Sequence, residues 1–235
     1  MPSSLLPVAE NANIKQQSHD FVCSWSGGKD ACLALFLMQQ HGHNAKALLT
    51  MMSENGQQSR AHHLPAEIIQ QQANALGLPC ILQATAKSDY QNAYLEALAQ
   101  SQTLGADSVV LGDIDLQAHR DWQEQQAALS HLSALFPLWL TDHRELVDSF
   151  VELGFKATIM AVHPEKCPES FLGTTFDMNT IAELEQLGID VCAEGGEFHT
   201  VVTDGPIFKQ PIELNIAQAT IQNGEFGYRY LDFSQ

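Results

Sequence analysis

Two stretches of the sequence concentrate residue types that bind phosphate or move protons. The first is S-G-G-K-D at residues 26–30, which joins an apolar run at 21–25 to a segment with helical spacing of its apolar residues. A strand, a glycine turn and a helix start aim backbone N–H groups at one point, where the helix dipole is positive. Glycines let a ligand come close, and Lys29 adds a full positive charge. The stretch predicts a phosphate site, and an ordinary β–α turn is the alternative.

The second stretch, A-E-G-G-E-F-H-T-V-V-T-D-G-P-I-F at 193–208, is dense in ionisable and hydroxyl groups. Its E-x-x-E-x-H spacing suits metal ligation, acid–base chemistry or recognition of a polar substrate. The alternative is a loop whose carboxylates accept backbone N–H bonds and hold a tight turn. Spacing alone slightly favours that structural alternative.

The elements that must position these residues alternate in type along the first half of the chain. We expect strands at 21–25, 45–52, 78–84 and 106–114, and helices from residue 30 and at 66–76, 91–102 and 117–134. Such alternation predicts an α/β fold with a parallel, Rossmann-like sheet. Ligands bind beyond the carboxyl ends of such strands, so the loops at 26–30, 53–63 and 112–120 should converge on one crevice.

The pattern changes after Pro137. Helices are expected at 143–153 and 178–187, and strands at 156–162, 198–202, 212–221 and 228–233. We therefore predict a flexible tail over 1–19, a first domain over 20–135 and a second, smaller α/β domain over 136–235.

Composition narrows the class of partner. The 235 residues carry a net charge of −17 without a Lys/Arg cluster, so a nucleic-acid partner is not expected. The five cysteines form no C-x-x-C pair, which disfavours a zinc ribbon or a disulfide framework. We see no signal peptide and no apolar run of membrane-spanning length, so we expect a cytoplasmic protein without a membrane partner. A homodimer is compatible with the sequence.

The S-G-G-K-D string resembles the PP-loop of enzymes that split ATP into AMP and pyrophosphate. The other phosphate loop, G-x-x-x-x-G-K-[ST], is absent, which disfavours kinase or GTPase chemistry. The PP-loop pattern usually continues with Ser, whereas this chain has Ala31. The change removes one side-chain donor, worth about 1 kcal/mol.

Four segments together resemble the diphthine–ammonia ligase family of PP-loop ATPases. They are S-W-S-G-G-K-D, G-D-I at 112–114, P-L-W at 137–139 and G-G-E-F-H-T-x-x-x-D-G-P-x-F at 195–208. The resemblance implies a Rossmann-like (HUP/PP-loop) ATP-binding domain over 20–135 and a substrate-binding domain over 136–235. It also implies an amidation, in which a carboxylate is adenylated, pyrophosphate leaves and ammonia displaces AMP.

Other segments look more like the bacterial branch of that family. They are R-x-H-x-L-P at 60–65, G-D-I-x-L at 112–116 and L-F-P-L-W at 135–139. Ala118, His119 and Trp122 replace the Tyr-Gln and Arg of the diphthine enzymes, and Ala193 replaces a usual Gly. The acceptor should therefore differ from diphthine, and a corrinoid-related carboxylate is the candidate that the resemblance suggests.

The two stretches and the resemblance assign roles to named residues. Catalysis is expected from Lys29, Asp30, Glu197 and His199. ATP is expected to contact Ser24, Ser26, Gly27, Gly28, Lys29, Asp30, Gly112 and Asp113, with Asp30 holding Mg²⁺. The acceptor is expected to contact Arg60, His62, Glu194, Gly196, Glu197, His199, Thr200 and Asp204.

Two other functions remain open at this point. One is a nucleotide-binding regulator with weakened catalysis, which Ala31 would favour. The other is a PP-loop enzyme that modifies tRNA, which the acidic charge and the missing C-x-x-C disfavour. Residue 2 is Pro rather than a Cys nucleophile of a glutaminase, so ammonia would come free or from a separate donor protein.

Overall fold

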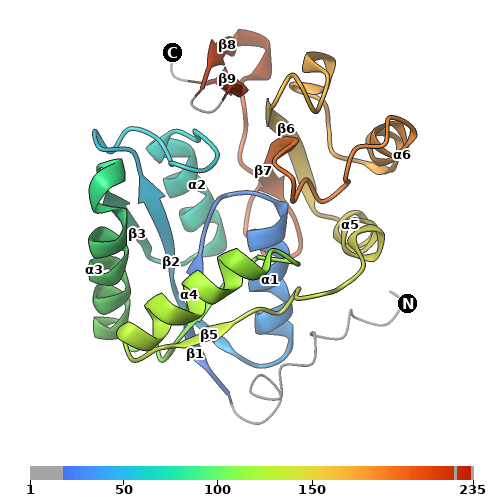
Figure 1. Cartoon of the computed structure of the whole chain (residues 1–235). Helices are drawn as coiled ribbons and strands as arrows, with labels where there is room; N and C mark the ends of the chain where they lie inside the picture. Colours follow the sequence, from blue (N-terminus) through green and yellow to red (C-terminus); the bar gives the residue numbers. More distant parts are fainter. Residues whose placement is uncertain (1–17, 225–226, 234–235) are drawn as a thin grey trace.

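A five-stranded sheet forms the first half of the molecule, which we describe from a computed structural model over residues 18–224 and 227–233 (Figure 1). The strand order is β3-β2-β1-β4-β5, and every pair is parallel. The strands are β1 (Asp20–Ser24), β2 (Asn44–Met52), β3 (Cys80–Ala84), β4 (Ser108–Val110) and β5 (Ser133–Leu135).

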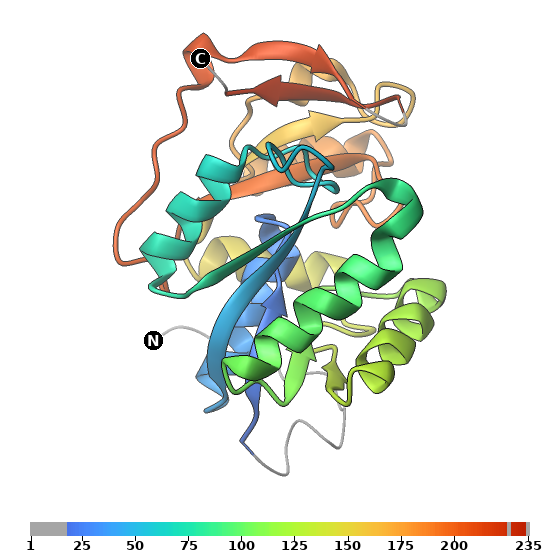
Figure 2. The same cartoon turned by 90° about the vertical axis from the view of Figure 1, so that its left-hand side faces the viewer.

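Helices cover both faces of this sheet because successive strand residues point to opposite sides. Phe21 and Cys23 of β1 face α1 (Lys29–Gln40) and α2 (Ala66–Leu76), whereas Val22 faces α3 (Tyr90–Thr103) and α4 (Gln117–Leu129). In Figure 2 the green helix α3 crosses in front of the sheet, and the yellow-green helix α4 lies to its right. The predicted Rossmann-like α/β fold is confirmed.

Strand β1 lies between β2 and β4, so the chain runs outward from β1 in both directions. At such a switch point the loops after neighbouring strands diverge and leave a crevice beyond the carboxyl ends. The turn after β1 and the loop after β4 border that crevice, which is where the sequence predicted them to meet.

A second, antiparallel sheet occupies the C-terminal half, in the order β7-β6-β9-β8 (Figure 2). Its strands are β6 (Lys156–Val162), β7 (Phe198–Asp204), β8 (Thr220–Asn223) and β9 (Arg229–Asp232). The helices α5 (His143–Glu152) and α6 (Met178–Gln186) accompany it. Short 3-10 turns occur at Lys87–Asp89, Glu169–Phe171 and Ile216–Gln218.

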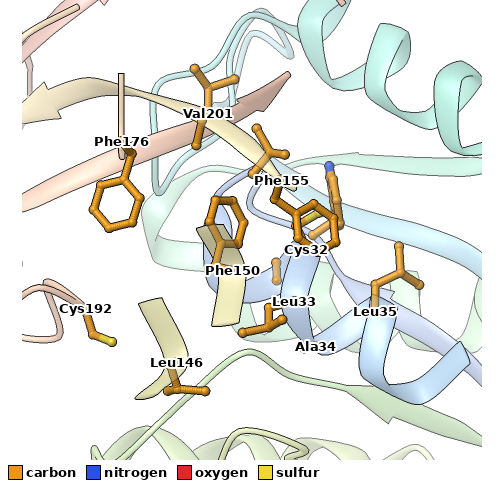
Figure 3. Close-up of a cluster of buried hydrophobic side chains, with 14 of the residues drawn as sticks. Cys32, Leu33, Ala34, Leu35, Leu146, Phe150, Phe155, Phe176, Cys192 and Val201 are labelled. Carbon is orange, nitrogen blue, oxygen red and sulfur yellow. The ribbon is translucent and has the colours of Figure 1, made fainter. Parts of the chain in front are cut away.

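The two halves share one hydrophobic core. Figure 3 shows Cys32 and Leu33 of α1 together with Phe150, Phe155 and Val201 of the C-terminal half. Phe150 and Phe155 stack with their ring centroids 5.0 Å apart. Helix α1 is therefore buried between the first sheet and the second half, which explains its nearly continuous apolar sequence.

Three predicted elements are wrong in extent. The helix predicted to reach residue 134 ends at Leu129, and Ser133–Leu135 form the unpredicted strand β5. No Gly or Pro marks that change, and pairing with β4 decides it. The strand predicted at 106–114 is only three residues long, as β4. The strand predicted at 212–221 is an irregular segment, a 3-10 turn and then β8.

The structure does not test two of the predictions made from the sequence, the flexible tail and the domain boundary. The tail predicted over 1–19 falls mostly outside the described residues, and the boundary near 136 stays a prediction. Among the helices that the structure describes, none has the length and apolar character needed to cross a membrane.

Candidate functional site

A cavity of about 550 Å³ opens at the switch point of the parallel sheet. Its walls come from the turn after β1, the loops after β2 and β4, and the segment that leads into β7. Twelve of the sequence-predicted residues line it: Ser24, Ser26, Lys29, Asp30, Arg60, His62, Gly112, Asp113, Glu194, Gly196, His199 and Thr200. The volume lies within the range of small-molecule sites.

The two glycines of the turn lie behind the cavity wall. Gly27 adopts φ +82°, and a Cβ there would come within 2.6 Å of Leu64. A Cβ on Gly28 would come within 2.6 Å of the His62 ring, and its N–H donates to Ser26 Oγ (3.2 Å). These glycines are required by packing, and in this structure they do not line the cavity.

Strand β7 holds the turn from behind. The Val202 N–H donates to the Gly27 carbonyl (2.9 Å), and the Lys29 N–H donates to Thr200 Oγ1 (3.1 Å). The buried Gln72 side chain donates to the carbonyls of Gly27 (2.9 Å) and Val202 (2.8 Å). A residue far along the chain, Thr200, thus supplies the acceptor that Gly28 lacks at the start of α1.

Lys29 projects from the helix start into the cavity wall, although only 4% of the residue is exposed. Its Nζ donates to Asp30 Oδ2 (2.8 Å) and to the Cys192 carbonyl (2.5 Å). Burial opposes its charge, but Asp30 and other neighbours outweigh burial and raise the Lys29 pKa. Lys29 is therefore a cation, and these contacts use two of its three N–H donors.

Carboxylates gather on the same side of the cavity. Burial, and then the neighbouring Asp30, raise the pKa of Glu194 to about 7, although Lys29 partly offsets them. Burial also raises the pKa of Asp113, which lies 3.4 Å from His119 Nδ1. Glu194 can therefore exchange a proton near neutral pH, as a general acid or base must.

Two histidines of the cavity, His62 and His199, are poor bases. The His62 and His199 rings stack with centroids 4.3 Å apart, and His199 stacks on Tyr228 at 4.9 Å. Burial lowers the pKa of His62 to about 4 and places that of His199 well below its usual value. Both rings are neutral at physiological pH and form an aromatic wall.

Besides Gly27 and Gly28, two further predicted residues, Glu197 and Asp204, do not line the cavity. Glu197 packs its carboxylate under the Gly195 turn, where Oε2 is buried without a hydrogen-bond partner among the described residues. Asp204 lies at the far end of β7, where Oδ1 accepts from the Gly205 N–H (2.9 Å) and Oδ2 lies 3.9 Å from Lys156 Nζ. Asp204 fits the structural alternative that the spacing had favoured.

Sequence reasoning missed several residues that shape the site. Tyr90 and His119 line the cavity, and the Cys192 carbonyl anchors Lys29. His119 lies in the loop at 112–120, which was expected to border the crevice, so its place in the sequence could have identified it. Tyr90 lies at the start of α3 without a local motif, and a backbone carbonyl leaves no trace in a sequence.

Magnesium fits the cavity on chemical grounds. Mg²⁺ takes hard oxygen ligands and usually combines one or two carboxylates with substrate phosphates. The carboxylate of Asp30 lines the cavity with Glu194 and Asp113, whose pKa values are raised mainly by burial and further by the negative charge of Asp30. A divalent cation at Asp30 would offset that charge.

A second group of ligand-type atoms is already occupied. His143, Asp190 and Cys192 place such atoms within 4.8 Å of one another. The Asp190 carboxylate, however, accepts from the N–H groups of Cys192 (3.1 Å) and Glu194 (2.9 Å), and burial raises the pKa of the Cys192 thiol. We assign this group to an internal hydrogen-bond network rather than to a metal.

Comparisons with known proteins agree on one family. Residues 20–130 match the family model "Diphthamide synthase N-terminal domain", and residues 142–232 match "Diphthamide synthase C-terminal domain". The chain is 24% identical over 229 residues to the diphthine–ammonia ligase of Danio rerio, covering 85% of this chain and 88% of that protein. It is 25% identical over 230 residues to that of Homo sapiens, covering 85% and 84%.

One solved structure shows a low structural similarity to this chain. The predicted subunit of tRNA methyltransferase from Methanocaldococcus jannaschii superposes with a TM-score of 0.44 at 16% identity, covering 83% of this chain and 100% of that chain. That likeness is too low to inform function. The matches to both domain models span most of the sequence, and the chain belongs to the diphthamide synthase family.

Proposed function

We propose that this protein is an AMP-forming amidoligase, which uses ATP to activate a carboxylate and ammonia to convert it to an amide. The family and its relatives named diphthine–ammonia ligase support an ATP-dependent ligase. The cavity supports the same class, because a buried cation and a carboxyl group that titrates near neutrality line one space.

Activation would take place at the start of α1. The remaining N–H of Lys29 would contact the phosphates of ATP, and Asp30 would hold Mg²⁺, which offsets phosphate charge when bound. An oxygen of the acceptor carboxylate attacks the α-phosphorus, the bond to the β-phosphate oxygen breaks, and pyrophosphate leaves. Arg60 lines the cavity and would hold the acceptor carboxylate.

Amidation would follow in the same space. Ammonia attacks the acyl carbon, the bond to the AMP oxygen breaks, and the nitrogen gives up a proton. Glu194 would accept that proton, since the pKa of about 7 lets it be ionised at neutral pH and still hold a proton well. The neutral His62 and His199 pair would form the wall behind the acceptor rather than the base.

The single observation that carries the proposal is the position of Glu194 in one cavity with Lys29 and Asp30. An ATP-binding regulator needs the cation, but it has no need of a carboxyl group that is poised to exchange protons. For the acceptor we propose a carboxylate other than diphthine, with corrinoid-related acids as the first candidates. We place the reaction in the cytoplasm, where ATP is available.

The test measures which nucleotide is released. Purified protein is incubated with ATP, Mg²⁺, ammonium and a panel of carboxylates, and AMP, ADP and pyrophosphate are separated. AMP and pyrophosphate in equal amounts, dependent on one carboxylate and on ammonium, are expected. ADP as the only product would overturn the proposal.

The same experiment distinguishes the proposed ligase from an ATP-binding regulator. If ATP binds with a measurable Kd but no carboxylate in the panel elicits AMP above the level of a Lys29→Met variant, the regulator is favoured. Ala31 would then be the first residue to change, because it lines the cavity where the PP-loop pattern has Ser.

A further inference from the structure

We propose that His143 is a positioning residue that ties the loop after β4 to the loop before β7 and thereby fixes Glu194 in the cavity. The inference rests on the role proposed above for Glu194. His143 itself lies outside the cavity lining, at the first position of α5.

Both ring nitrogens of His143 face carboxylates. Nδ1 lies 2.7 Å from Asp190 Oδ1, and Nε2 lies 3.3 Å from Asp115 Oδ2. Burial opposes charge on the ring, but Asp190 and then Asp115 and Glu194 outweigh it and raise the His143 pKa. With a proton on each nitrogen, the ring is hydrogen-bonded to Asp190 and forms an ion pair with Asp115.

Asp190, which is held by His143, in turn holds the loop before β7. Its Oδ1 accepts from the Cys192 N–H (3.1 Å) and its Oδ2 from the Glu194 N–H (2.9 Å). Between those two amides, Ala193 adopts φ +61°, a left-handed conformation that costs an alanine free energy. A loop in this conformation needs external support, and Asp190 supplies it from one side.

Residues in the first half of the chain support the loop before β7 from its other side. Asp115 follows β4, in the loop whose Gly112 packs against the backbone of Ala31. Lys29 holds the Cys192 carbonyl from the turn after β1. The His143 ring therefore links the loops on both walls of the cavity, through a hydrogen bond to Asp190 and an ion pair with Asp115.

The first test measures loop order without catalysis. Amide hydrogen exchange of Cys192 and Glu194 is compared in His143→Gln, Asp115→Asn and a matched control, Arg144→Gln, whose ion pairs with Asp148 and Glu185 lie on the outside of α5. We expect exchange to accelerate about tenfold in His143→Gln, as for one lost hydrogen bond, and not in the control. Equal exchange in all three variants would overturn the proposal.

The milder Asp115→Asn variant keeps the test decisive if His143→Gln folds poorly. Asp115 has 42% of its side chain exposed, so its replacement should be tolerated. The His143 imidazole signal is followed by NMR, and we expect it to titrate at lower pH once this carboxylate is gone. The other ionisable groups near the ring are Asp190, Glu194 and Cys192, and all three remain in the variant.

The second test uses kinetics. In His143→Gln we expect kcat for amide formation to fall about tenfold, with the KM for ATP unchanged. The pH at which the rate rises should move upward, because a positive neighbour of Glu194 has been removed. A merely structural defect would leave that pH unchanged. If the wild type forms no AMP but the exchange result stands, the proposed function fails while the connection through His143 is upheld.

Discussion

Single side chains in the cavity owe their proton affinities to burial and to their neighbours. Burial beside other carboxylates raises the pKa of Glu194 to about 7, whereas burial beside Lys29 lowers the pKa of His62 to about 4. The usual order of the two residue types is thereby inverted. The proposed mechanism therefore assigns the role of base to the carboxyl group of Glu194 rather than to an imidazole.

Replacing Lys29 by Met should weaken ATP binding by about 1.5–3 kcal/mol, or roughly 10- to 150-fold in Kd, because a charge-assisted contact is lost. The Kd is measured by calorimetry with a non-hydrolysable ATP analogue. Lys156→Met is the control, since 69% of that side chain is exposed and it lies away from the cavity. Equal Kd values for the two variants would contradict the assigned role.

Replacing Glu194 by Gln should remove the pH dependence of amide formation near neutrality. The proposal makes the ionised carboxylate the active form in the wild type, so the rate should rise as pH increases through about 7. The Gln variant should be slow at every pH and show no rise in this range. A variant that kept the wild-type profile would assign the titration to another group.

At the scale of elements, strand β7 supports the turn after β1. Main-chain and side-chain bonds join Val202 and Thr200 to the turn, and Gln72 of α2 links both. The turn is thus fixed by residues from two distant parts of the sequence, β7 and α2. The turn is therefore ordered before a ligand binds, so binding does not have to order it.

Replacing Gln72 by Leu should destabilise the protein by about 1–3 kcal/mol for each buried group that loses its partner. The Trp25 Nε1–H loses its partner, and the carbonyls of Gly27 and Val202 each lose one hydrogen bond, although the Gly27 carbonyl keeps the bond from the Val202 N–H. The free energy of unfolding is measured in urea. Gln70→Leu on the exposed side of the same helix is the control, and a loss no larger than that of the control would contradict this account.

Elements with strong local signals were predicted from the sequence, and those set by pairing were not. The helix predicted over 66–76 is confirmed. It could be predicted because Pro65 precedes it and Gly77, at φ +72°, ends it. Strand β5 was missed because three residues without flanking Gly or Pro depend on β4 for their conformation. Tertiary pairing decides such short segments.

The same distinction holds for the site. Lys29, Asp30 and Glu194 lie in dense local motifs and reach the cavity, as predicted. Asp204 belongs to the same dense stretch, but the direction of β7 carries it away. His143 and Asp190 escaped prediction because 47 positions separate them, and only the fold brings them together.

At the scale of the whole molecule, the shared core should make unfolding of the two halves cooperative. Phe150→Ala should cost about 3–5 kcal/mol, as for a fully buried aromatic side chain. Hydrogen exchange of β1 and β6 should accelerate together in this variant. Leu187→Ala, at a position 58% exposed, is the control, and acceleration confined to β6 would show that the halves unfold separately.

The left-handed Ala193 has a consequence for engineering. Changing Ala193 to Gly should relieve about 1–2 kcal/mol of backbone strain, less about 0.4–1 kcal/mol for a more disordered unfolded chain. A selection for thermal resistance would thus favour the glycine. The same change would widen the conformational range of the residue that precedes Glu194, so the hardier enzyme should be the slower one. Melting temperature and kcat, measured on the same preparation, should move in opposite directions.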